Sequence, residues 1–281
     1  MSTTSPLVST QWLADHLGDQ KLVVLDGSFK LPGVTPIARE DYQARHIPGA
    51  RFFDIDAVAD HSTTLPHMLP SPAEFEKAAE ALGISNDSFI VVYDTPGLMS
   101  AGRIWWTFRV FGHQQVAILD GGLKAWMAEG RPVTAETPEV TRGAFKATFD
   151  AGRVVSKADL LENVSTGERP LIDARSAARF NAVEKEARPG LRSGHVPGSL
   201  NLPFNLLTDP ETGRMKPVAD IERLFRDAGL DMSKPTIASC GSGVTACALV
   251  FGMYLTGKDD VAVYDGAWTE WGMPGETPVE P

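Results

Sequence analysis

The sequence predicts an α/β protein built from two similar units, each a parallel sheet flanked by helices. Three observations predict this: the second half of the chain repeats the first, short β-branched runs alternate with helical patterns, and glycine-bearing turns follow several of these runs. The length of 281 residues suits two domains, and a 43% hydrophobic share gives each of them enough apolar side chains for a core.

The repeat keeps a nearly constant offset along the chain. Asp26 in "LVVLDGS" matches Asp173 in "PLIDARS", 147 residues later, and His46 in "HIPGA" matches His195 in "HVPGS", 149 residues later. Self-similarity at a fixed offset indicates a duplicated structural unit. We therefore expect a first domain over residues 1–138, a linker over 139–155 and a second domain over 156–281.

The first unit contains three buried strand patterns and one clearly signalled helix. Its strand patterns are "KLVVLD", "FIVVYD" and "QVAILD", over residues 21–26, 89–94 and 115–120. Ser71, Pro72 and Glu74 supply an N-cap, a proline at the first helical position and a capping-box acid. A helix should therefore begin at Pro72 and end near Gly83.

The second unit repeats this order. Its strand patterns are "PLIDA", "PTIAS" and "DVAVYD", over residues 170–174, 235–239 and 260–265. Ser156 followed by Asp159 predicts the start of its first helix. The elements of the two units therefore correspond one to one.

The stretch "ASCGSGVTACALV" places Cys240 between a predicted strand and a predicted helix. A glycine-rich turn that opens a helix directs backbone N–H groups and the positive end of the helix dipole at one point. Gly241 and Gly243 allow the chain to fold back tightly, while Ser242 and Thr245 add hydroxyl donors. We expect this loop to favour the Cys240 thiolate, the nucleophilic form of cysteine.

The same position in the first unit holds a carboxylate. Asp94 in "VVYDTPGLMS" aligns with Cys240, so the first unit lacks a nucleophile there. A lone cysteine is often only a small buried hydrophobe, and this is how we interpret Cys247, which lies inside the apolar run "VTACALVFGMYL". Cys240 differs because it lies at a strand end, where α/β sheets bind ligands.

Charge and composition limit the partners and the compartment. A formal net charge of −10 argues against nucleic acid and against anionic membrane surfaces, and favours a small molecule or another protein. Two cysteines make no disulfide framework, and neither a signal peptide nor a long apolar run is apparent. We expect a soluble, unexported, cytoplasmic protein without a metal site or a cofactor.

The motifs "CGSGVTA", "HIPGA", "HVPGS", "DARSAARF" and "HMLPSP" together resemble those of the tandem rhodanese-domain sulfurtransferases. The resemblance covers nearly the whole chain and implies two rhodanese-like domains, the first of them catalytically silent. It implies that Cys240 takes sulfur as a persulfide and passes it to an acceptor. The implied acceptors are a thiol, such as thioredoxin or a small thiol, or cyanide.

The loop "CGSGVT" is most similar to the branch of the family that uses 3-mercaptopyruvate and releases pyruvate. The thiosulfate-using branch typically carries basic residues directly after the cysteine, where this chain has Gly241 and Ser242. A dianionic thiosulfate gains from cations inside the loop, whereas a carboxylate can be held by arginines at its rim. Thiosulfate remains the alternative donor.

The resemblance also assigns the binding residues. It places the donor carboxylate on Arg179 in "ARF" and Arg188 in "EARPG", since a guanidinium holds a carboxylate through two parallel hydrogen bonds. The loop residues expected to contact substrate are Gly241, Gly243, Val244 and Thr245. Arg175, two residues after a repeated aspartate, is expected to be structural.

Two roles stay open. His46 and His195 both precede Pro-Gly turns in the two units, which favours a scaffold role. The family mechanism is sometimes drawn with a Ser, His and Asp relay, which here could use Ser242 and His46. The sequence does not decide between these interpretations.

Two other classes of function compete with sulfur transfer. A cysteine phosphatase on a similar loop needs an arginine six residues after the cysteine, and Ala246 occupies that position. A non-catalytic binding module is the second rival, because the first unit has already lost its cysteine. Formation of a persulfide on Cys240 would exclude it.

Overall fold

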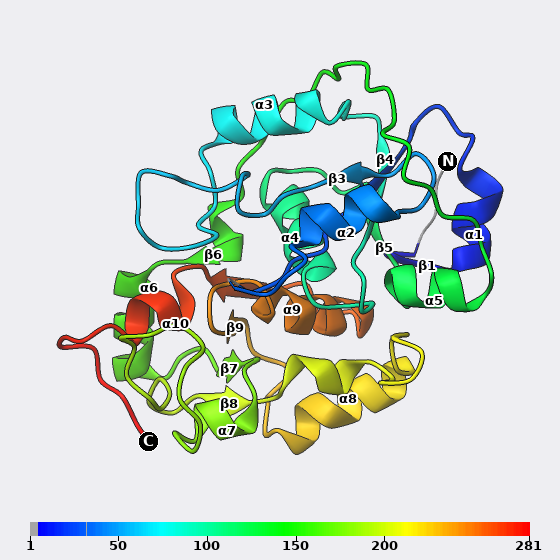
Figure 1. The fold of residues 1–281 in the computed structure, drawn as a ribbon. Coiled ribbons are helices and arrows are strands. Elements are labelled where there is room, and N and C mark those ends of the chain that lie inside the picture. The colour runs from blue at the N-terminus through cyan, green and yellow to red at the C-terminus, as the bar shows by residue number, and fades with distance from the viewer. Residues whose placement is uncertain (1–4, 32) are drawn as a thin grey trace. The chain divides into compact units, whose positions relative to one another are not determined.

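The computed structural model describes residues 5–31 and 33–281, and its elements follow the predicted α/β order in both halves (Figure 1). The elements of the first half are β1 (Leu7–Val8), α1 (Thr10–His16), β2 (Leu22–Asp26), α2 (Ala38–Ala44), β3 (Arg51–Phe52), α3 (Pro72–Ala81), β4 (Phe89–Tyr93), α4 (Ala101–Val110), β5 (Val116–Leu119) and α5 (Gly122–Ala128). Those of the second half are η1 (Ala151–Arg153), β6 (Val154–Val155), α6 (Lys157–Thr166), β7 (Leu171–Asp173), α7 (Ala177–Phe180), β8 (Leu200–Asn201), η2 (Phe204–Leu207), α8 (Val218–Asp227), β9 (Thr236–Ser239), α9 (Ala246–Leu255), β10 (Val261–Tyr264) and α10 (Ala267–Trp271).

Each half forms its own five-stranded sheet. The strand orders are β1-β5-β4-β2-β3 and β6-β10-β9-β7-β8, so the two sheets have the same topology, and every described strand pair is parallel. The central strands are buried because parallel sheets are covered by helices on both faces. The prediction of two parallel α/β sheets is confirmed.

The helix signals read from the sequence are confirmed as well. The Ser71 side chain accepts a hydrogen bond from the Glu74 backbone N–H, the Glu74 side chain returns to the Ser71 N–H, and Pro72 opens α3. Ser156 and Asp159 form the same capping box at the start of α6. A capping box satisfies two helix N–H groups that would otherwise lack partners.

The chain divides into two compact units that exchange short segments. Unit 1 contains the first half of the chain as far as Asp150, without residues 60–69, and adds Thr208–Met215. Unit 2 contains Ala151–Leu207 and Lys216–Pro281, and adds Asp60–Leu69. Each unit therefore includes a short segment from the other repeat. A division of the chain into residues 1–138 and 156–281 does not include this exchange.

The segment expected to link the domains also differs from a free linker. Phe145 is buried, its ring lies 5.6 Å from that of Phe75, and the Thr148 N–H donates to Phe111 O at 2.9 Å. Val154–Val155 already form β6 of the second sheet. The segment packs against the two units because it carries apolar side chains that are buried on folding. Comparison of the two repeats does not detect these side chains.

Candidate active site

Cys240 follows β9 directly, at the carboxyl end of the unit 2 sheet. Its backbone oxygen accepts a hydrogen bond from the Trp268 N–H at 2.9 Å, and Gly241 O accepts one from the Thr269 N–H at 2.9 Å. Gly243 has a φ of 75°, a conformation that glycine adopts without strain, and α9 begins three residues later. The cysteine is 1% exposed, so the loop surrounds the thiol and shields it from water.

The matching loop of unit 1 shows what this backbone arrangement binds. Asp94 Oδ1 accepts from the Gly97 N–H at 2.8 Å, and Oδ2 accepts from three more N–H groups at 2.7–2.9 Å, those of Met99, Ser100 and Ala101. The loop amides therefore converge on an anion held by the residue at the strand end. In unit 2 the residue at that position is Cys240, the predicted nucleophile.

Arg179 lies beside the cysteine loop. It belongs to the short helix α7, whose N-cap is Ser176. A Cβ atom placed on Gly241 would lie 3.8 Å from Arg179 Nη1, so the guanidinium borders the residue next to the nucleophile. The side chain is 26% exposed, which leaves part of the guanidinium open to a ligand.

A buried carboxylate joins Arg179 to the core of unit 2. Glu186 Oε1 lies 2.6 Å from Arg175 Nη1, and Glu186 Oε2 lies 3.5 Å from Arg179 Nη1. Arg175 also pairs with Asp173 at 2.8 Å and stacks on the Trp268 ring at 4.3 Å. The structural role expected for Arg175 is confirmed. Glu186, which sequence reasoning missed, pairs with Arg179, one of the two arginines predicted to bind the donor carboxylate.

His67 is a second residue that sequence reasoning missed. It belongs to the segment that the first repeat contributes to unit 2, and its Nε2 lies 3.3 Å from Arg188 Nη2. The Leu69 N–H donates to Asp265 Oδ2 at 2.8 Å, which ties this segment to the end of β10. The motif "HMLPSP" was a signal of its importance, but only the long-range fold shows that its histidine lies beside Arg188.

The histidines of the two Pro-Gly turns are bound to the backbone. His46 lies in unit 1, where Nδ1 is 2.7 Å from Tyr42 O and Nε2 is 3.1 Å from Glu136 O. His195 Nδ1 lies 3.0 Å from Phe180 O, and its ring stacks on that of Phe180 at 3.9 Å. Because these contacts hold the turns, they favour the scaffold role for both histidines.

The remaining loop residues lie close to Cys240 in the chain and differ in exposure. Val244 is buried, Ser242 is nearly so, and Thr245 is partly exposed. Cys247 is fully buried, and its thiol donates to Gly243 O at 3.3 Å. Packing and a local hydrogen bond therefore account for Cys247, and neither cysteine forms a disulfide.

The residues that the structure describes contain no group of three or more His, Cys, Asp or Glu side chains arranged to hold a metal ion. Within the same residues, no helix combines the length and the apolarity that crossing a membrane requires.

Known proteins resemble this chain over almost its entire length. The rhodanese-like domain family matches residues 9–129 and 156–273. The 3-mercaptopyruvate sulfurtransferase of Rattus norvegicus is 44% identical, and the match covers 95% of this chain and 92% of that protein. The 3-mercaptopyruvate sulfurtransferase of Escherichia coli K12 is 42% identical, and the match covers 100% of this chain and 99% of that protein. The thiosulfate sulfurtransferase of Cricetulus griseus is 46% identical, and the match covers 97% of this chain and 94% of that protein.

A solved structure agrees with these sequence relatives. The crystal structure of SseA from Escherichia coli, described as a 3-mercaptopyruvate sulfotransferase with a rhodanese fold, has a TM-score of 0.86 and 39% identity. It covers 94% of this chain and 99% of that one. With two rhodanese-like domains and full-length relatives that transfer sulfur, the chain belongs to the tandem rhodanese-domain sulfurtransferases.

Proposed function

We propose that this sulfurtransferase takes its sulfur from 3-mercaptopyruvate. The observation that carries the proposal is the arrangement around Gly241: no charged side chain follows the cysteine within the loop, while the Arg179 guanidinium borders it from outside. This arrangement suits a donor whose carboxylate lies at the rim and whose sulfur reaches inward. The mercaptopyruvate-using relatives at 42–44% identity support the same donor.

The proposed first half-reaction forms a persulfide on Cys240. The thiolate attacks the donor sulfur, a sulfur–sulfur bond forms, and the carbon–sulfur bond breaks with its electron pair passing to the organic fragment. That fragment leaves as the enolate of pyruvate and takes up a proton. The loop amides, which hold a carboxylate in unit 1, would stabilise the thiolate before this step and the persulfide anion after it.

The second half-reaction returns the enzyme to its starting state. An acceptor thiolate, or cyanide, attacks the outer sulfur of the persulfide, and the electron pair of the sulfur–sulfur bond returns to Cys240. Thioredoxin or a small thiol remains our proposal for the thiol acceptor. Two free cysteines suit a reducing compartment, so the proposed location is the cytoplasm.

We assign the other residues roles that follow from their surroundings. Arg179 and Arg188 bind the donor carboxylate, and the loop from Gly241 to Thr245 surrounds the reacting sulfur. Ser242 assists proton movement beside Cys240. The contacts of His46 with Tyr42 O and Glu136 O favour leaving it out of this relay.

Thiosulfate is the competing donor, and one observation favours it. The Cricetulus griseus relative, at 46% identity, is named for thiosulfate. Both donors would react with the same cysteine, so the choice between them depends on charge at the loop.

Parallel steady-state kinetics with the two donors test the proposal. We expect the larger kcat/KM for 3-mercaptopyruvate, and we expect Arg179→Lys to lower this value because an ammonium cannot make the paired hydrogen bonds of a guanidinium. Arg223→Lys is the matched control, since Arg223 is exposed on α8 and pairs with its neighbour Asp220. A larger kcat/KM for thiosulfate would overturn the choice of donor.

A further inference from the structure

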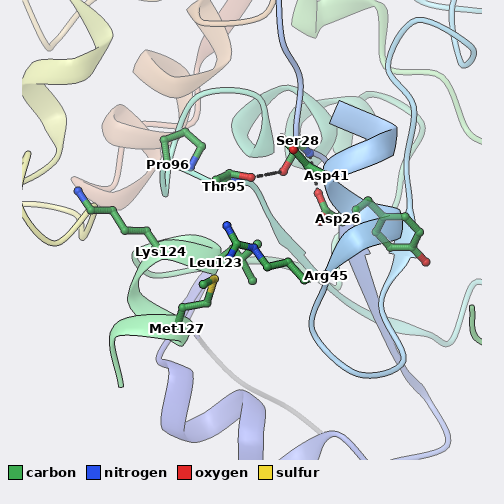
Figure 2. Close-up of a pocket in the computed structure, with 10 residues that line it drawn as sticks. Asp26, Ser28, Asp41, Arg45, Thr95, Pro96, Leu123, Lys124 and Met127 are labelled. Atoms are coloured by element: carbon green, nitrogen blue, oxygen red, sulfur yellow. Dashed lines mark hydrogen bonds between the residues drawn. The ribbon is translucent and has the colours of Figure 1, made fainter. Parts of the chain in front are cut away.

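Unit 1 contains a pocket at the carboxyl ends of its strands. The pocket measures about 370 Å³, a size typical of small-ligand sites. Asp26 at the end of β2 and Thr95 after β4 line it, together with Leu123 and Met127 of α5 and Arg45 at the end of α2 (Figure 2). This is the edge at which parallel α/β sheets bind ligands.

One wall of the pocket has the same backbone hydrogen bond as the equivalent position in unit 2. The Ser28 N–H donates to Asp26 Oδ1 at 2.9 Å, as the Arg175 N–H donates to Asp173 Oδ1 at 2.8 Å. Ser28 therefore occupies the backbone position of Arg175.

The opposite wall corresponds in the same way. The Leu123 N–H donates to Asp94 O at 3.0 Å, and the Trp268 N–H donates to Cys240 O at 2.9 Å. Leu123 therefore occupies the position of Trp268.

In unit 2 this place is filled by protein. The Arg175 side chain is fully buried, pairs with Asp173 and lies over the Trp268 ring. Unit 1 replaces the arginine with serine and the tryptophan with leucine, two much smaller side chains, but keeps the aspartate. The pocket is thus the space left where unit 2 has a guanidinium stacked on an indole.

Asp26 keeps its carboxyl group there without the cation that unit 2 supplies. It is 2% exposed, and its hydrogen-bond donors are the neutral groups of Ser28 and Tyr93. Across residues 5–31 and 33–281, no lysine, arginine or histidine forms an ion pair with it. Burial raises the pKa of Asp26, as expected of a carboxyl group that lacks a countercharge.

Some of the charged side chains that line the pocket have partners within the protein, and others do not. Asp41 is paired with Lys30, and Lys124 Nζ donates to Pro210 O at 2.8 Å. Arg45 is exposed; its backbone N–H donates to Asp41 O at 2.9 Å, but in the described part of the chain its side chain has no hydrogen-bond or ion-pair partner. One carboxyl group therefore lacks a cation and one guanidinium lacks an anion.

We propose that this pocket binds a small zwitterion, whose planar cation lies against Asp26 where unit 2 holds Arg175 and whose carboxylate pairs with Arg45. A guanidino acid has both groups, and free L-arginine, which also carries an α-ammonium group, is a readily available probe of this class. The proposal concerns unit 1 alone and does not depend on the donor used by Cys240.

Calorimetric titration of the full chain at constant ionic strength tests the proposal with three probes: L-arginine, methylguanidinium and valerate. We expect saturable binding of L-arginine, with weaker binding of methylguanidinium, which lacks the carboxylate. Arg45→Gln should weaken L-arginine binding about tenfold, the usual order for loss of a charge-assisted pair, and leave methylguanidinium binding unchanged.

Filling the pocket from within is the decisive control. Ser28→Arg restores the side chain of unit 2 and should abolish L-arginine binding, as should Leu123→Trp, which fills the space from α5. Far-UV circular dichroism and urea unfolding serve as the folding check for both variants, because Cys240 belongs to unit 2 and does not report on unit 1. A variant that fails to fold is thereby recognised, and the other decides. No saturable binding to the wild type, unchanged binding in both filled variants, or valerate bound as tightly as L-arginine would each overturn the proposal.

Discussion

Glu186 Oε2 lies 3.5 Å from Arg179 Nη1, while its other oxygen lies 2.6 Å from Arg175 Nη1. The Glu186 side chain is only 4% exposed, so this carboxylate connects the arginine that borders the cysteine loop to a fully buried arginine. The Arg179 side chain remains 26% exposed. Our proposal that Arg179 binds the donor carboxylate therefore gives Glu186 a positioning role.

Replacing Glu186 should affect binding more than chemistry. Glu186→Gln keeps the shape of the side chain but removes the charge that holds Arg179, and loss of one charge-assisted contact costs about 1.5–3 kcal/mol. We expect KM for 3-mercaptopyruvate to rise about tenfold or more, with a much smaller fall in kcat. Steady-state kinetics measure both values.

The matched control is Glu184→Gln, because Glu184 is exposed and lies two residues away. Equal effects of the two variants on KM, or an effect of Glu186→Gln on kcat alone, would contradict a positioning role for Glu186.

The carboxylate in the silent loop should be important for stability. Asp94→Ala leaves four N–H groups without this acceptor, three of them in buried hydrogen bonds and one in a partly buried one, and one unsatisfied buried group costs about 1–3 kcal/mol. We expect the free energy of unfolding to fall by about 3 kcal/mol or more in urea titrations. Asp87→Ala, which removes an exposed ion pair with Lys21, should change it by less than about 1 kcal/mol. Similar losses in both variants would show that the loop does not need its anion.

The two glycines of the cysteine loop should differ in their tolerance of a side chain. Gly243 has a φ of 75°, so Gly243→Ala forces alanine into a left-handed conformation at a cost of about 1–2 kcal/mol. At Gly241 the nearest atom to an added Cβ is 3.8 Å away, an ordinary contact, so Gly241→Ala should cost less stability. Thermal unfolding of both variants measures the difference, and a greater loss for Gly241→Ala would contradict this prediction.

The pH dependence of stability should contain a contribution from His113 in unit 1. Burial lowers the pKa of His113 below its ordinary value of 6.5, so the unfolded chain takes up this proton more readily than the folded one. The contribution of neutral His113 to the free energy of unfolding is therefore fully present above pH 6.5 and is lost as the pH falls below this value.

Urea unfolding between pH 5 and pH 7 measures this loss. His113→Gln should make the slope with pH smaller over this range, whereas His61→Gln, at an exposed position, should leave the slope unchanged. An unchanged slope in His113→Gln would assign the pH dependence to other groups.

Much of the fold could be predicted because duplication is visible in the sequence. The fixed offset aligned Asp94 with Cys240, and the capping boxes at Ser71 and Ser156 marked two helix starts. These signals are local or repeated, so no three-dimensional information was needed to find them.

The rest depends on contacts between distant parts of the chain. His67 meets Arg188 across 121 residues, and a repeat comparison does not show which unit contains the segment that carries His67. Glu186 was missed because its burial between two arginines has no periodic signature. The unit 1 pocket could have been suspected from Ser28 in place of Arg175, but its size also depends on Leu123, which lies far along the chain.

The most direct test of sulfur transfer through Cys240 is the mass of the intact protein after treatment with 3-mercaptopyruvate, followed by peptide mapping. We expect one added sulfur, located on Cys240, with one pyruvate released for each sulfur bound, and none on Cys247. A Cys240→Ser variant that still gained and transferred sulfur would contradict it.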